Sequence, residues 1–95
     1  MDFSNLNILY VEDEARSRKV MQMIAMDMGV KNLTVFDDSS NFETRVTALH
    51  PKPDVIFLDI HVPPHNGFEM LAMLRANSQF DAVPIVAMTA SVMNE

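Results

Sequence analysis

The chain contains no cysteine among its 95 residues. This absence excludes a disulfide framework and any thiolate-based metal or nucleophile site, and it suits a reducing compartment. No apolar run approaches the roughly 18 residues of a membrane-spanning helix, and the opening segment MDFSNLN lacks the basic start of a signal peptide. We therefore expect a cytoplasmic protein with no membrane segment.

Basic residues are also scarce. Seven Lys and Arg face 13 Asp and Glu, which gives a net charge of −6, and the Lys and Arg residues form no cluster. Such a chain offers no surface that neutralises phosphates, so we expect no nucleic-acid binding. No linker, internal repeat or low-complexity segment divides the sequence, and its length corresponds to one small domain, residues 1–95.

The sequence instead alternates short apolar runs with helical patterns. The apolar runs predict strands at Asn7–Val11, Leu33–Phe36, Asp54–Leu58 and Val83–Met88. Apolar residues at helical spacing predict helices at Ala15–Met28, Asn41–Leu49 and Phe68–Ala76. This alternation indicates βα units, a parallel sheet and right-handed crossovers.

Side chains at the helix ends and on the first helix carry further information. Gly29 is suited to end the first helix, and Asp37–Ser40 offers N-cap side chains to the second. Val20, Ile24 and Met28 share one face of the first helix. The methionines of this helix cannot all share that face, so we interpret them as adaptable core filling with some exposure. A Met-rich contact surface is the alternative.

Acidic side chains follow two of the predicted strands. Ile8–Val11 leads into Glu12 and Asp13, and Val55–Leu58 leads into Asp59. Ligands of open parallel sheets collect outside the carboxyl ends of the strands, where these carboxylates meet if the first and third strands pair. Carboxylates about 4.5 Å apart repel by roughly 4 kcal/mol per pair at an effective dielectric of about 20. A hard cation such as Mg²⁺ would offset this repulsion, and a solvated acidic edge is the alternative.

Three polar residues lie at or near the same edge. Thr89 ends the fourth strand, where its hydroxyl could bond an anion held near Asp59 or a local backbone group. His61 and His65 belong to the turn-rich loop that follows the third strand. Histidine can act in acid–base chemistry, although on a turn it is more often simply solvated.

Three segments in order carry a family resemblance. The segments are ILYVEDE, VIFLDIHVPPHNG and PIVAMTAS, and together they resemble the receiver domain of two-component response regulators over nearly the whole chain. The resemblance implies a flavodoxin-like, doubly wound parallel sheet of α/β class. We expect about four strands in the order 2-1-3-4 with three helices, forming a signalling module rather than an enzyme.

The resemblance also implies roles for individual residues. Asp59 would accept a phosphoryl group from a sensor histidine kinase or a phosphotransfer protein. Mg²⁺ would be bound by Glu12, Asp13, Asp59 and the backbone carbonyl of His61. Thr89 would be the switch hydroxyl that responds to the phosphoryl group.

The chain departs from the family pattern towards its C-terminus. Gly67 matches the loop glycine of the family, but Val62 stands where most members carry Met. The family's fifth strand, which ends in a Lys, and the helices around it have no counterpart, and Lys19, Lys31 and Lys52 all precede the third strand. We therefore expect a C-terminally incomplete receiver domain with weakened phosphate stabilisation and an open sheet edge.

The sequence favours three other functions less. A truncated, phosphorylation-impaired receiver would act as a protein interaction or self-association module, for example as a homodimer through the open sheet edge. An aspartyl-phosphate hydrolase would need a second acid near Asp59, and Asp59-Ile60-His61 provides none. A flavodoxin-type cofactor binder would need a Ser/Thr/Gly-rich phosphate cradle, which neither strand-to-helix turn contains.

Overall fold

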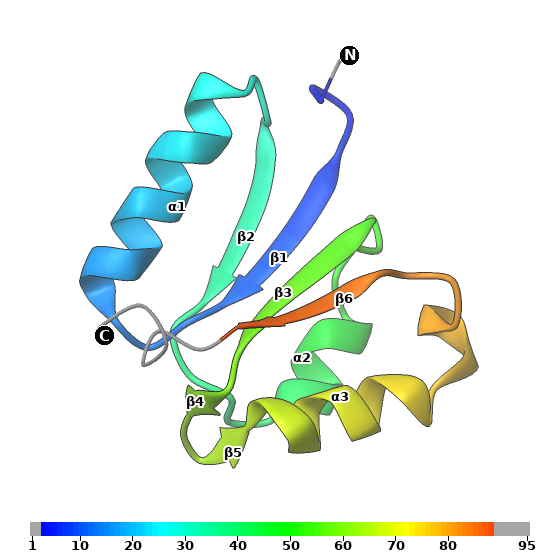
Figure 1. The fold of residues 1–95 in the computed structure, drawn as a ribbon. Helices are drawn as coiled ribbons and strands as arrows, with labels where there is room; N and C mark the ends of the chain where they lie inside the picture. Colours follow the sequence, from blue (N-terminus) through cyan, green and yellow to red (C-terminus); the bar gives the residue numbers. More distant parts are fainter. Residues whose placement is uncertain (1–2, 89–95) are drawn as a thin grey trace.

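The sheet is parallel and has four strands. In the computed structural model, which describes residues 3–88, its order is β2-β1-β3-β6. Its strands are β1 (Asn7–Val11), β2 (Asn32–Phe36), β3 (Val55–Asp59) and β6 (Ile85–Met88). This confirms the predicted order 2-1-3-4, because β6 is the fourth strand of the sheet. In Figure 1 the arrowheads of β2, β1 and β3 point to the same end of the molecule.

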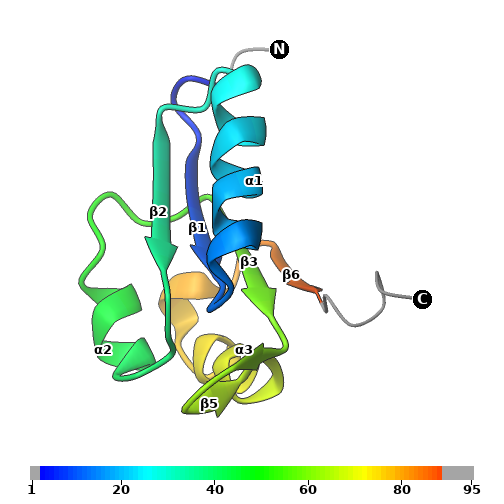
Figure 2. The same cartoon turned by 90° about the vertical axis from the view of Figure 1, so that its left-hand side faces the viewer.

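The three predicted helices cover the two faces of the sheet unequally. They are α1 (Ala15–Asp27), α2 (Phe42–Thr47) and α3 (Gly67–Arg75). Figures 1 and 2 show α1 on one face of the sheet and both α2 and α3 on the other. Within residues 3–88, none of the helices is long and apolar enough to cross a bilayer.

The main hydrophobic core joins α2 and α3 to the sheet. Its residues alternate along the central strands, as expected for side chains that point to one face. The buried members are Leu9, Val11, Phe36, Phe42, Val46, Ile56, Leu58, Val62, Met70, Leu74, Phe80 and Val83. Burying large side chains such as Phe42 and Phe80 completely contributes about 1.5–3 kcal/mol each, before the cost of ordering the chain.

The face that carries α1 is less well covered. Val20 and Ile24 are each 49% exposed and Met26 is 76% exposed, whereas Ala25 is the buried residue of this helix. Val86, on β6, is 42% exposed. The apolar face predicted for α1 therefore exists, but within the described part of the chain it is only half covered. Its methionines contribute more to the surface than to the core.

Two short elements were not predicted. Residues 61–66, predicted as a turn-rich loop, form an antiparallel hairpin of β4 (His61–Val62) and β5 (His65–Asn66). A 3₁₀ turn, η1 (Ser78–Phe80), precedes β6 and buries Phe80 in the core. Both elements are too short for apolar periodicity to reveal them.

One helix end agrees with the sequence analysis, one differs from it, and one has a cap that the sequence analysis did not identify. Gly29 has φ +82° after α1, as a helix-ending glycine should. At α3, Asn66 and Glu69 form reciprocal capping bonds of 2.8 and 2.9 Å. The expectation of N-cap side chains in Asp37–Ser40 was wrong. Asn41 is the N-cap of α2, in a left-handed conformation with φ 51°, and makes no side-chain capping bond within residues 3–88.

The different burial of two methionines makes the core testable. Met70 is fully buried and Met26 is largely exposed, so their truncation should have very different effects. We expect Met70→Ala to lower the free energy of unfolding by about 2–5 kcal/mol through lost contacts and a cavity. The control Met26→Ala should change it by less than about 0.5 kcal/mol. Urea unfolding of both variants measures this, and equal effects would contradict the packing described above.

Candidate functional site

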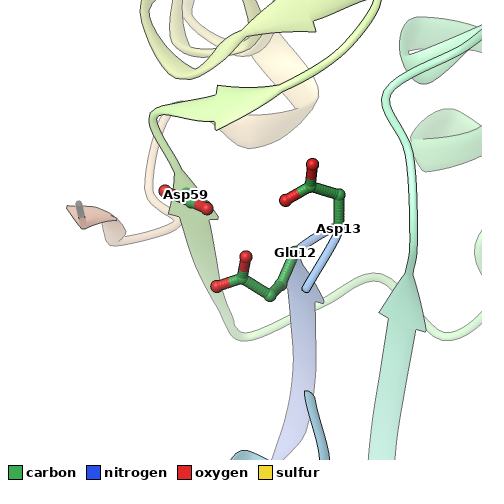
Figure 3. A group of neighbouring side chains, drawn as sticks. All are labelled: Glu12, Asp13 and Asp59. Carbon is green, nitrogen blue, oxygen red and sulfur yellow. The ribbon is translucent and has the colours of Figure 1, made fainter. Parts of the chain in front are cut away.

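Three carboxylates converge at the carboxyl end of the sheet. The parallel register pairs Val11 of β1 with Leu58 of β3, so Glu12, which follows β1, lies beside Asp59, the last residue of β3. One oxygen from each of Glu12, Asp13 and Asp59 lies within 4.8 Å of the others. Figure 3 shows the three side chains directed toward one another. The structure thus brings together the acidic residues that the sequence singled out.

The three acids differ in their contact with solvent. Glu12 is 4% exposed and Asp59 is 5% exposed, whereas Asp13 lies at the surface. Two carboxylates held almost out of water, next to a third, are strongly unfavourable as bare anions. The cluster therefore favours either a bound cation or a retained proton.

Glu12 is fixed by bonds to both its side chain and its backbone. The Tyr10 hydroxyl donates to Glu12 Oε1 at 3.0 Å, and the Glu14 backbone N–H donates to Oε2 at 3.3 Å. Arg18 reaches back from α1 and donates to the Glu12 carbonyl oxygen at 3.0 Å. The Glu12 N–H in turn donates to the carbonyl of Phe36 at the end of β2 at 3.0 Å. Glu12 is thereby held to β2, α1 and its own strand.

The environment of Glu12 favours its protonated form in the metal-free chain. Burial raises the pKa of Glu12 from 4.5 to about 7, and the neighbouring Asp59 carboxylate adds to the shift. Burial and the bond to Glu12 also raise the pKa of Tyr10 above its ordinary value, so the phenol remains a hydrogen-bond donor. A cation placed among the carboxylates would oppose this retention of a proton by Glu12.

Asp59 lies where backbone segments approach closely. The His61 N–H donates to Asp59 Oδ1 at 3.4 Å, and the Ile60 N–H donates to the Met88 carbonyl at 2.8 Å. The Gly67 N–H donates to the Ile60 carbonyl at 2.8 Å. A Cβ atom at Gly67 would lie 2.9 Å from the Ile60 Cα and 3.0 Å from the Asp59 carbonyl oxygen. Only glycine allows the start of α3 to pack this closely against the residue pair that carries Asp59.

A hollow of about 370 Å³ opens beside the cluster. It lies between Asp13 and the β4–β5 hairpin, and its walls include His61, His65 and Glu69. The exposed carboxylate of Asp13 therefore faces a space that a second molecule can enter.

The donor set suits a hard divalent cation. Carboxylate oxygens, with room for water ligands on the exposed side, are what Mg²⁺ takes in proteins. The histidines do not join the acids: Glu12, Asp13 and Asp59 are the group of possible metal ligands found within residues 3–88. Such an all-oxygen set does not favour zinc.

Other residues predicted for the site are placed only in part. His61 follows Asp59 by two residues and lies on β4, so its backbone is at the site. Thr89 lies outside the described residues. Lys52 donates to the Gln79 carbonyl at 2.9 Å, beside the turn that precedes β6, and so is engaged elsewhere.

Tyr10 is a site residue that the sequence analysis did not identify. It lies in the apolar run of β1, where it was interpreted as an ordinary strand residue. The available signal was its position two residues before Glu12, which places both side chains on the same face of an extended chain.

A family model supports the resemblance seen in the sequence. The model described as response regulator receiver domain matches residues 8–95. Among curated proteins, the DNA-binding response regulator MtrA of Mycobacterium tuberculosis (strain ATCC 25618 / H37Rv) is 33% identical over 90 residues, covering 95% of this chain and 37% of MtrA. Protein PilG of Pseudomonas aeruginosa is 22% identical over 85 residues, covering 90% of this chain and 61% of PilG. The chain thus spans less than two thirds of either relative.

Solved structures agree with the fold. The crystal structure of the Mn(2+)-bound form of response regulator Rcp1 superimposes with a TM-score of 0.80 at 24% identity. The match covers 90% of this chain and 66% of Rcp1. At this identity the likeness supports the arrangement of strands and helices, which matches the sheet described above.

The raised pKa of Glu12 predicts that the metal-free chain loses stability as pH rises. The folded chain keeps a proton on Glu12 where the unfolded chain has released it. The resulting contribution to the free energy of unfolding is complete below about pH 4.5 and disappears as the pH passes about 7. We expect a loss of at most about 3 kcal/mol across this window. Urea unfolding in chelator at about pH 5 and about pH 8 measures it.

The variant Glu12→Gln provides the comparison for this pH dependence. Glutamine keeps the shape of a protonated glutamic acid but cannot ionise, so the loss of stability between the two pH values should shrink. An unchanged loss in Glu12→Gln would assign the pH dependence to other groups.

Proposed function

Because the chain belongs to the response regulator receiver family, we propose that it accepts a phosphoryl group on Asp59 from a phosphohistidine and passes the signal on through a change of conformation. The observation that carries the proposal is the convergence of Glu12, Asp13 and Asp59 within 4.8 Å. Asp59 is the acid that ends the buried central strand β3, and the hollow beside Asp13 gives a donor side chain a way to approach.

The proposed step is a phosphoryl transfer between two side chains. A carboxylate oxygen of Asp59 attacks phosphorus, an oxygen–phosphorus bond forms, and the phosphorus–nitrogen bond of the donor breaks. The electron pair of that bond leaves with the donor's imidazole. The chain contributes mainly by positioning, since such transfers depend on alignment and charge stabilisation. The close approach of Gly67 to the backbone of Asp59 and Ile60 would help to hold in place the residue that carries the attacking group.

The residues that would hold Mg²⁺ are Glu12, Asp13, Asp59 and the backbone carbonyl of His61. When bound, the ion supplies positive charge that offsets the repulsion among the carboxylates and the phosphoryl oxygens. In this state Glu12 would be ionised, and the bonds from Tyr10 and the Glu14 N–H would keep its two oxygens in place. Asp13, the exposed acid, would leave room for water ligands.

Thr89 completes the proposal as the residue that senses phosphorylation. It follows β6, whose Met88 carbonyl already accepts the Ile60 N–H next to Asp59. A phosphoryl group on Asp59 would accept a hydrogen bond from the Thr89 hydroxyl and draw the segment after β6 towards the site.

The kinase or phosphotransfer protein would be the partner that supplies the phosphoryl group. We further propose that residues 1–95 form part of a receiver domain and that the protein works in the cytoplasm.

Self-association is a second candidate function, favoured by the incomplete cover over α1 and β6. Val20, Ile24 and Val86 are each close to half exposed, and β6 pairs only with β3 among the described strands. A second copy of the chain could cover these groups. This function and phosphoryl transfer are compatible, since the acidic cluster lies at the end of the sheet.

A charge placed on β6 tests self-association. If copies pair through this face, sedimentation should show a concentration-dependent dimer for the unmodified chain and a monomer for Val86→Lys. Phe68→Lys is the matched control, because Phe68 is also exposed but lies on α3, across the sheet. A chain that stays monomeric at every concentration, or a dimer broken equally by both variants, would rule this candidate out.

Phosphorylation of Asp59 is tested with a small phosphodonor. With acetyl phosphate and Mg²⁺, the chain should gain the mass of one phosphoryl group, and hydroxylamine should remove it because the bond is an acyl phosphate. Asp59→Asn should abolish the gain. Asp27→Asn, which alters a carboxylate at the far end of α1, should leave it intact. Intact-mass measurement reads the result, and equal labelling of Asp59→Asn would refute the assignment.

A further inference from the structure

Ser39 is a fully buried polar residue in the loop between β2 and α2, residues 37–41. It is 0% exposed, and its hydroxyl contacts both strands of the β4–β5 hairpin. The Ser39 Oγ donates to the Val62 carbonyl at 2.5 Å and accepts from the His65 N–H at 2.6 Å. The Ser39 N–H also donates to the Pro63 carbonyl at 3.1 Å. One small side chain and its backbone thus bond to three residues of the hairpin.

These bonds leave little choice of residue at position 39. Alanine would leave the buried Val62 carbonyl and the partly buried His65 N–H without this partner, and unpaired polar groups away from water are unfavourable. Threonine would add a methyl group to a side chain that already has no exposed surface. The requirement is for a small side chain that donates one hydrogen bond and accepts another.

The loop that carries Ser39 is itself anchored. Arg45 of α2 donates to Asp38 Oδ1 at 2.7 Å and to the Ser40 carbonyl at 2.9 Å. Its guanidinium carbon lies 4.1 Å from the centre of the Phe36 ring, at the end of β2. The residues on both sides of Ser39 are therefore held by Arg45. Because the loop is fixed, the bonds of Ser39 also fix the position of the hairpin.

The hairpin in turn begins two residues after Asp59. His61, its first residue, donates its N–H to Asp59 Oδ1, and Val62 is fully buried in the core. The hairpin also walls the hollow beside Asp13. Any shift of the hairpin relative to β3 would move the His61 backbone with respect to the carboxylates.

We propose that Ser39 is a positioning residue for the Asp59 site: its buried hydroxyl holds the β4–β5 hairpin so that the backbone of His61 stays in place to complete the cation site. This inference rests on the proposed function, since it assigns Ser39 a role in a site that binds a divalent cation. Ser39 acts through the hairpin and does not itself contact the carboxylates.

The test compares Mg²⁺ affinity in four variants of the 95-residue chain, after urea unfolding has measured the stability of each. Ser39→Ala removes the hydroxyl, and Ser39→Cys keeps a weaker donor of similar size. Ser40→Ala is the matched control, because the Ser40 hydroxyl bonds Asp38 within the same loop. Leu49→Ala removes a partly buried side chain that packs against the core and also borders a hollow with Asn7 and Pro53, and it reports the effect of lost stability alone.

Two measurements are made on each variant. Titration with Mg²⁺ alone, followed by backbone amide NMR, gives the affinity, and amide hydrogen exchange at His65 reports the bond to Ser39. We expect Ser39→Ala to bind Mg²⁺ about tenfold more weakly, as is typical when a residue behind a metal ligand is removed. Exchange at His65 should accelerate, Ser39→Cys should be intermediate, and the Ser40 and Leu49 variants should keep the affinity of the unmodified chain.

The outcomes separate this inference from the proposed function. If the unmodified chain binds Mg²⁺ and Ser39→Ala binds it equally well, Ser39 is only structural and the inference is overturned. A loss of affinity in Leu49→Ala as large as that in Ser39→Ala would also overturn it, because stability alone would then explain the effect. If the unmodified chain binds no Mg²⁺, the proposed cation site fails, and the role of Ser39 fails with it. Should Ser39→Ala not fold, Ser39→Cys decides by the same criteria.

Discussion

The parallel register between β1 and β3 is the constraint on which the rest of the structure depends. It sets Val11 opposite Leu58, and the next residue along each chain segment, Glu12 or Asp59, therefore brings a carboxylate to the same place. Moving this register by one residue would turn the inward-facing side chains of one strand outward and separate the acids. The hydrophobic core and the acidic cluster thus both depend on the pairing of β1 with β3, and a shift of this register would disrupt both.

The surrounding backbone keeps the acids close together against their repulsion. The end of β2 accepts the Glu12 N–H, Gly67 packs against the Asp59 carbonyl, and the hairpin after Asp59 is bonded to Ser39. These contacts come from the end of β2, from the loop that follows it and from the start of α3. The site is therefore assembled from segments distant in sequence, and its geometry reflects the fold as a whole rather than one motif.

The sequence predicted those parts of the structure that depend on local patterns. Apolar runs located the four strands of the sheet, and the acids that follow them located the cluster. The contact of Ser39 with the hairpin could not be found this way, because a serine before a helix is a typical cap and only the tertiary structure directs its hydroxyl to the hairpin instead. The exposure of Val20 and Ile24 could not be predicted either, since helical spacing shows that two residues share a face but not what covers that face.

The uneven cover of the two sheet faces has a consequence for how the molecule opens. With Ala25 as its buried residue, α1 has less holding it to the sheet than α2 and α3 have through the main core. It should therefore belong to a separate cooperative unit that unfolds locally while the central strands remain protected. Because Arg18 ties α1 to the Glu12 carbonyl, each local opening of this helix also releases one restraint on the acidic cluster. Ligand binding at the cluster would then make local unfolding of α1 less frequent, although the ligand itself does not contact the side chains of this helix.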